Sequence, residues 1–202
     1  MVQGERIGCP PDLPRRPIYL DHNATTPVDT RVLQALLPYL GRDFGNPSSA
    51  HVFGVAPRAA LARARGQVGA LVGAGADEIV FTAGGSEADA LAIQGVVRSA
   101  LSERPHVVPH VVTQTTEHPA VLAACASLER DHGVAVTYLP VDRGGMVDPA
   151  AVEAALCAET VLVSLMAANN ETGTLQPVDE VGAITRAGGG CCTSTQPRLP
   201  AR

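Results

Sequence analysis

The sequence predicts an α/β fold, in which a mainly parallel sheet carries helices on both faces. Two observations lead to this prediction. Short apolar or β-branched segments alternate with longer segments of helical periodicity along most of the chain. Polar clusters follow three of the short segments, at residues 84–86, 117–118 and 169–171. Ligands of parallel sheets bind beyond the carboxyl ends of the strands, so these clusters predict a site there.

Composition places the chain among globular proteins. Of its 202 residues, 46% are apolar and 17% are charged, a balance that supports a packed core. The net charge of −5 argues against nucleic acid and anionic membranes as partners. No apolar run approaches the length of a membrane span, and residues 1–17 lack the apolar core of a secretory signal. We therefore expect a cytoplasmic protein.

Cysteine and lysine usage narrows the chemistry further. The five cysteines are odd in number and lack C-x-x-C spacing, so we expect neither a disulfide framework nor a metal site. All 15 basic residues are arginine. These 202 residues therefore offer no lysine side chain to any reaction.

The N-terminal elements follow from local patterns. Residues 1–17 are proline-rich and predict a flexible lead-in, and residues 18–20 predict a short strand. A helix is expected over residues 30–40, capped by Asp29 or Thr30, because its apolar residues share one face: Val32, Leu33, Leu36, Leu37 and Leu40. A second helix is expected with Pro57 in its first turn, ending near residue 72.

A glycine turn forms the centre of the predicted site. Residues 78–80 predict a strand, and an alanine-rich helix follows the turn. Gly84 and Gly85 are expected to adopt backbone angles closed to other residues. Ser86 is expected to cap the helix, whose free N–H groups and the serine hydroxyl would bind an anion such as phosphate. An ordinary capped connection between strand and helix is the alternative.

The remaining elements complete the alternation. Strands are predicted over residues 110–114, 134–141 and 160–166. Helices are predicted to open at Pro119, after Asp148 and at residue 178, the last of them running to residue 187.

Five motifs then resemble the cysteine desulfurases, which are class V aminotransferase-like, pyridoxal-phosphate-dependent enzymes. In chain order they are IYLDHNATTP at 18–27, GNPSSAH at 45–51, FTAGGSEAD at 81–89, TEHPAV at 116–121 and NNETG at 169–173. The resemblance implies that residues 18–187 are a truncated large domain of a fold-type I pyridoxal-phosphate enzyme.

The resemblance also implies roles for individual residues. Gly85 and Ser86 would hold the phosphate of pyridoxal 5'-phosphate, and His118 would stack on its ring and assist acid–base steps. Asn170 would hydrogen-bond the ring hydroxyl, and residues 23–25 would line the substrate side. Ala90 stands where many relatives have asparagine, which would soften the local hydrogen bonding.

The implied activity is the removal of sulfur from L-cysteine, giving L-alanine and an enzyme persulfide for iron–sulfur cluster assembly or other sulfur transfer. A homodimer and a sulfur-acceptor protein are the implied partners. The alternatives are a selenocysteine lyase and a non-catalytic fragment with residual phosphate binding. The family's Schiff-base lysine and nucleophilic cysteine have no counterpart here, so we expect this truncated chain to be inactive.

Residues 188–202 predict an aberrant tail. Three glycines and two prolines offer neither a strand pattern nor a core. With suitable GC-rich codons, a one-base shift from residue 190 yields Val-Leu-His-Leu-Asp-Ala-Ala-Gln, the family's next strand. This frameshift hypothesis predicts poor packing of the tail, and an ordered strand there would contradict it.

Overall fold

The computed structural model describes residues 17–188 and 191–195. The lead-in predicted for residues 1–17 lies outside the described residues except at its last position. The chain divides into two compact units, with the boundary between Ala59 and Ala60. Over the described residues, none of the helices combines the length and the apolar character needed to cross a membrane.

The first unit contains the predicted helix α1, Thr30–Leu40, with the bounds expected from the sequence. Asp29 caps it, because its carboxylate accepts the backbone N–H of Arg31 at 2.8 Å. The apolar face of α1 is solvent-exposed, with between 43% and 75% of each residue accessible: Val32, Leu33, Leu36, Leu37 and Leu40. Residues 18–20 lie before the helix as exposed coil, so the strand predicted there is wrong.

The loop after α1 is held by hydrogen bonds between side chains and backbone groups. Arg58 donates from Nε to the carbonyl of Pro47 at 2.9 Å, and the Asn46 side chain accepts the N–H of Ser48 at 2.8 Å. A Cβ at Gly45 would overlap the carbonyl of Phe53, so only glycine fits there. A 3-10 turn, Val52–Gly54, leads into α2, Val55–Val72, with Pro57 in its first turn as predicted.

The second unit is built on a four-stranded sheet of order β2-β1-β3-β4. Its strands are β1 His110–Gln114, β2 Ala135–Leu139, β3 Thr160–Met166 and β4 Cys191–Thr195. Every pairing within it is parallel, which confirms the predicted parallel sheet. The order requires crossover connections, and the helices supply them.

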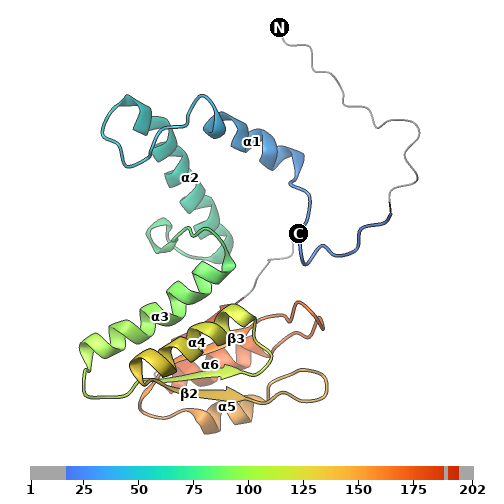
Figure 1. The fold of residues 1–202 in the computed structure, drawn as a ribbon, viewed down its shortest axis with the longest axis vertical. Coiled ribbons are helices and arrows are strands. Elements are labelled where there is room, and N and C mark those ends of the chain that lie inside the picture. The colour runs from blue at the N-terminus through green and yellow to red at the C-terminus, as the bar shows by residue number, and fades with distance from the viewer. Residues whose placement is uncertain (1–16, 189–190, 196–202) are drawn as a thin grey trace. The chain divides into compact units, whose positions relative to one another are not determined.

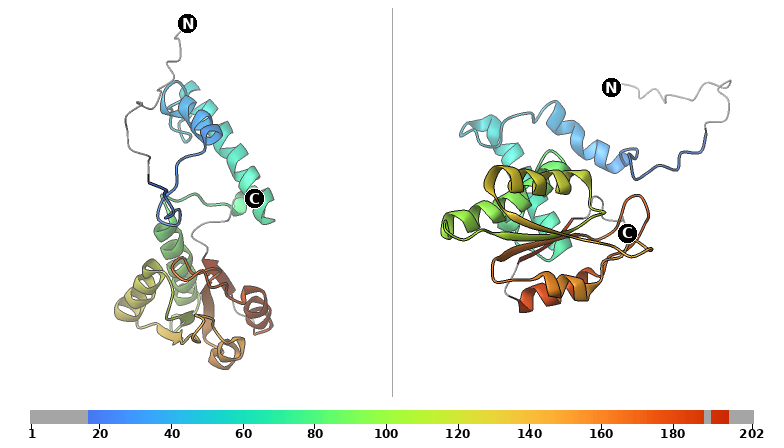
Figure 2. Two further views of the ribbon diagram at one scale, coloured as in Figure 1. Left: turned by 90° about the vertical axis from the view of Figure 1, so that its right-hand side faces the viewer. Right: turned by 60° about the horizontal axis from the view of Figure 1, so that its bottom comes forward.

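Helices cover both faces of this sheet (Figures 1 and 2). On one face, α3 Gly85–Glu103 and α4 Pro119–His132 enclose the cluster of Ile93, Val97, Val111, Val121, Cys125, Leu128 and Leu162. On the other, α5 Pro149–Ala155 and α6 Val178–Ala187 enclose Val112, Leu139, Val147, Val152, Val163, Leu165 and Val181. Successive strand residues point to opposite faces, so an unbroken apolar strand supplies both clusters.

The strand predicted at residues 78–80 is wrong. A 3-10 turn, Ala76–Glu78, occupies its start, and Ile79 is extended but outside the sheet. The carbonyl of Ile79 accepts Nε of Arg65 at 3.2 Å. β-Branched residues favour an extended backbone, but a strand also needs a neighbouring strand to pair with.

The tail also departs from prediction. β4 pairs with β3 from Leu162 opposite Cys191 to Met166 opposite Thr195. The expectation of no ordered strand in residues 188–202 is therefore wrong at 191–195, and the frameshift hypothesis loses its structural support. Strand pairing uses backbone groups, so the free edge of β3 accepts a segment without an apolar pattern, and Thr193 and Thr195 suit an extended backbone.

The two described free cysteines are expected to differ in reactivity. Cys125 lies in the α3–α4 cluster, and burial raises the pKa of its thiol to about 11, whereas Cys157 is exposed. With that pKa, roughly one Cys125 thiol in a thousand is ionised at a pH of about 8. Only the thiolate is nucleophilic, so Cys125 should react slowly. Iodoacetamide followed by peptide mass mapping should label Cys157 and spare Cys125 until urea is added. Equal labelling of both in the folded chain would contradict this prediction.

Candidate functional site

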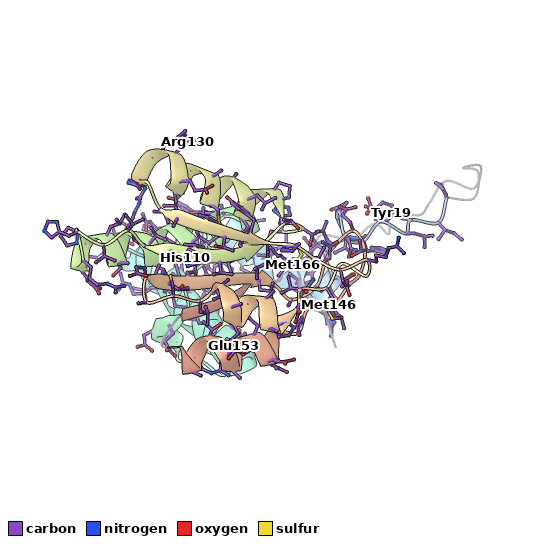
Figure 3. All side chains as sticks on the ribbon, turned by 90° about the horizontal axis from the view of Figure 1, so that it is seen from below. Tyr19, His110, Arg130, Met146, Glu153 and Met166 are labelled. Carbon is purple, nitrogen blue, oxygen red and sulfur yellow. The ribbon has the colours of Figure 1, made fainter. Side chains whose placement is uncertain are left out.

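The predicted site residues belong to three segments of the second unit. Gly85 and Ser86 begin α3, His118 precedes α4, and Asn170 follows β3. Figure 3 shows His110, at the start of β1, at one end of the sheet, and Met166, at the end of β3, toward the other. The His118 and Asn170 segments therefore follow the carboxyl ends of parallel strands, as the sequence predicts.

The N-terminus of α3 is built differently from the prediction. Gly84, not Ser86, is the N-cap residue. No side chain caps α3; the carboxylate of Glu87 instead accepts the N–H of Ala83, the residue before the N-cap, at 2.6 Å. Thr82 stabilises the turn by donating its hydroxyl to the carbonyl of Gly84 at 3.1 Å. Ser86 is thus the second residue of the helix, with its side chain at the exposed first turn.

The backbone conformation of this turn does not require glycine. Gly84 has a φ of 174°, an extended value open to any residue, so the expected special backbone angle is wrong there. The described glycines with positive φ are Gly73, Gly133, Gly145 and Gly173. A Cβ built on Gly84 or Gly85 would meet nothing within 4 Å.

The open space above the two glycines suits an anion. The first intrahelical bond joins the N–H of Ala88 to the carbonyl of Gly84 at 3.1 Å. The N–H groups of Gly85, Ser86 and Glu87 precede it and have no intrahelical acceptor. They carry the positive end of the helix dipole, and the hydroxyl of Ser86 adds a donor. A phosphate fits this donor set and the space that side chains would otherwise fill.

His118 lies close to the start of α3. Burial raises the pKa of the Asp89 carboxyl, and the nearby imidazole of His118 opposes that shift. Asp89 belongs to the second turn of α3. The electrostatic interaction therefore places the half-buried His118 within range of Asp89, one turn after Gly85 and Ser86.

Two hydrogen bonds join the His118 loop to the Asn170 loop. The carboxylate of Glu117, which is 5% exposed, accepts the N–H of Met166 at 2.5 Å. Asn169 donates its amide to the carbonyl of Thr116 at 3.1 Å. The segment after β1 and the segment after β3 are thus fastened together, immediately beside His118 and Asn170.

Asn169 also shapes the loop that carries Asn170. Its Oδ1 accepts the N–H groups of Glu171 and Thr172, each at 2.9 Å. Asn170 itself donates to the carboxylate of Glu171 at 2.8 Å. Sequence reasoning singled out Asn170 and missed the positioning roles of Asn169 and Glu117. The sequence clue was their place beside the predicted residues, within the same polar clusters.

Metal binding is not indicated by the side chains. Within residues 17–188 and 191–195, there is no group of three or more histidine, cysteine or acidic residues arranged to hold a metal ion. The candidate site residues instead offer backbone N–H groups, a hydroxyl, an imidazole and a carboxamide, which suit a small polar organic anion.

Comparison with known proteins matches this chain to one family. The family model for class-V aminotransferases covers residues 18–195. The chain is 51% identical, over 86% of its length, to the cysteine desulfurase IscS of Anaeromyxobacter sp. (strain Fw109-5), and covers 42% of that protein. It is 49% identical, over 84% of its length, to the cysteine desulfurase of Rattus norvegicus, and covers 37% of it.

Solved structures show the same fold. A structure described as a NifS-like protein superimposes with a TM-score of 0.80 at 35% identity, over 88% of this chain and 48% of that one. A second, described as SspA in complex with cysteine, gives 0.81 at 35% identity, over 87% and 49%. The chain thus spans about two fifths of the curated relatives' length and about half of the structural ones. These class-V relatives are pyridoxal-phosphate enzymes.

Proposed function

Because this chain belongs to the class-V aminotransferase family, we propose that it forms the phosphate-binding part of a pyridoxal-phosphate-dependent cysteine desulfurase. The observation that carries the proposal is the open N-terminus of α3. N–H groups without an intrahelical acceptor, a serine hydroxyl and two glycines without close neighbours occur together there.

Each site residue has a role that follows from its chemistry. Gly85 and Ser86 would hold the phosphate through N–H groups and a hydroxyl, aided by the helix dipole. The flat imidazole of His118 would rest against the pyridine ring, and the carboxamide of Asn170 would donate to the ring hydroxyl. The bound cofactor would supply an electron sink for the substrate's α-carbon.

The proposed substrate is L-cysteine, whose sulfur would leave as an enzyme-bound persulfide with L-alanine as the other product. Support comes from the cysteine desulfurases to which the chain is about half identical. A selenocysteine lyase is the alternative with no observation in its favour. A homodimer, a sulfur-acceptor protein and a cytoplasmic location are further parts of the proposal.

The phosphate site is tested by binding of pyridoxal 5'-phosphate to the purified chain, measured by equilibrium dialysis. Ser86→Ala should weaken binding by about ten- to a hundredfold, because a hydrogen bond to a charged group contributes roughly 1.5–3 kcal/mol. Ser102→Ala, at the other end of α3, is the matched control and should bind as the wild type does.

Two competitors sharpen this test. Inorganic phosphate should displace the cofactor, and pyridoxal without its phosphate should bind far more weakly. If Ser86→Ala and Ser102→Ala bind alike, the phosphate does not lie at Gly85 and Ser86. If phosphate alone binds as tightly as the cofactor, the chain is a phosphate binder and the cofactor proposal fails.

A further inference from the structure

The first turn of α4 has one free N–H group that a side chain must accept, and His118 is the residue before the helix. Pro119 is the first helical residue and has no N–H group. The carbonyl of His118 accepts the N–H groups of Val121 at 2.9 Å and Leu122 at 3.2 Å. The N–H of Ala120 is left, and it donates to Nδ1 of the His118 imidazole at 3.1 Å. The imidazole is therefore the side-chain cap of α4.

This cap determines where the imidazole can carry a proton. Nδ1 accepts a hydrogen bond, so its lone pair must be unprotonated. A neutral imidazole has one N–H, which must then be at Nε2. A proton on Nδ1 would direct one N–H at another and leave Ala120 without an acceptor, at the positive end of the helix.

We propose that capping of α4 locks His118 in the neutral Nε2–H tautomer, so that His118 enters the site as a positioned hydrogen-bond donor. Its basic nitrogen faces the helix, so a proton leaving the substrate has to be taken up by another group. This inference rests on the proposed function only for the identity of the group that accepts the hydrogen bond from Nε2–H of His118. The carboxylates of Asp89, on the neighbouring helix, and of Glu117, the preceding residue, are nearby negative charges that would favour the protonated ring over the neutral one.

The tautomer is observable without cofactor or activity. Long-range proton–nitrogen correlation spectra of the 15N-labelled full chain distinguish the two nitrogens of each of its six histidines, and the His118 signals are those lost in His118→Asn. At neutral pH, we expect a protonated Nε2 and an unprotonated Nδ1 for His118. A proton on Nδ1, or equal averaging of the two tautomers, would overturn the proposal.

The cap itself is tested by a matched pair of variants. Asparagine is among the best N-cap residues and alanine among the poorest. His118→Ala should therefore shift the unfolding equilibrium toward the unfolded state by about fivefold, with His118→Asn within about twofold of wild type. Equal losses in the two variants would show that Nδ1 does not cap α4.

These tests are independent of the cofactor. Both variants remove the ring that would stack on pyridoxal 5'-phosphate, so both should weaken cofactor binding even though only alanine loses the cap. A wild-type chain that shows the Nε2–H tautomer and no cofactor binding would refute the proposed function and leave this inference standing.

Discussion

Replacing Glu117 by alanine is expected to lower the free energy of unfolding by about 2–4 kcal/mol, the largest stability effect predicted for a single polar residue here. Its buried carboxylate accepts the N–H of Met166 at 2.5 Å, which joins the loop after β1 to the end of β3. The substitution leaves that N–H buried without its acceptor and opens a cavity. Urea denaturation followed by circular dichroism measures the loss.

Two further variants show whether the hydrogen bond causes this effect. Glu117→Gln keeps an acceptor oxygen of nearly the same shape, so it should lose less than about half as much as the alanine variant. Glu153→Ala removes an exposed carboxylate on α5 and should change stability by no more than about 0.5 kcal/mol. If Glu117→Ala is as mild as Glu153→Ala, the link between the two loops is not structural.

The 202-residue chain is expected to hold pyridoxal 5'-phosphate without a covalent bond to any side chain. Imine formation needs an unprotonated amine, and all 15 basic residues here are arginine. Borohydride treatment and peptide mapping should therefore find no side-chain adduct, while any adduct at the terminal α-amino group is identified by its peptide. Sulfide release from L-cysteine should not exceed that of free cofactor.

The reverse result would be equally informative. Sulfide release well above the free-cofactor rate, and lost in His118→Ala, would show that this chain turns over cysteine without a lysine. In that case the expectation of inactivity would be withdrawn, while the phosphate site at Gly85 and Ser86 would be retained.

The helices were predictable because their signals are local. The bounds of α1 and α6 match the sequence patterns, and Asp29, Asp148 and Pro119 mark helix starts as expected. A cap needs only the residues of the first turn, and helical periodicity needs only neighbours along the chain. The membership of Gly85, Ser86, His118 and Asn170 in a single site, expected from the polar clusters, remains a prediction, as do their roles toward the cofactor.

Strand pairing and loop contacts could not be derived from those local signals. Residues 18–20 and 78–80 have strand-like composition but lie outside the sheet, while 191–195, which lack an apolar pattern, form β4. A strand exists only when another strand edge accepts its backbone groups, and that depends on residues far away in sequence. For the same reason, Glu117 and Asn169 gained their roles only in the folded chain, where β1 and β3 bring the ends of two distant segments within hydrogen-bond distance.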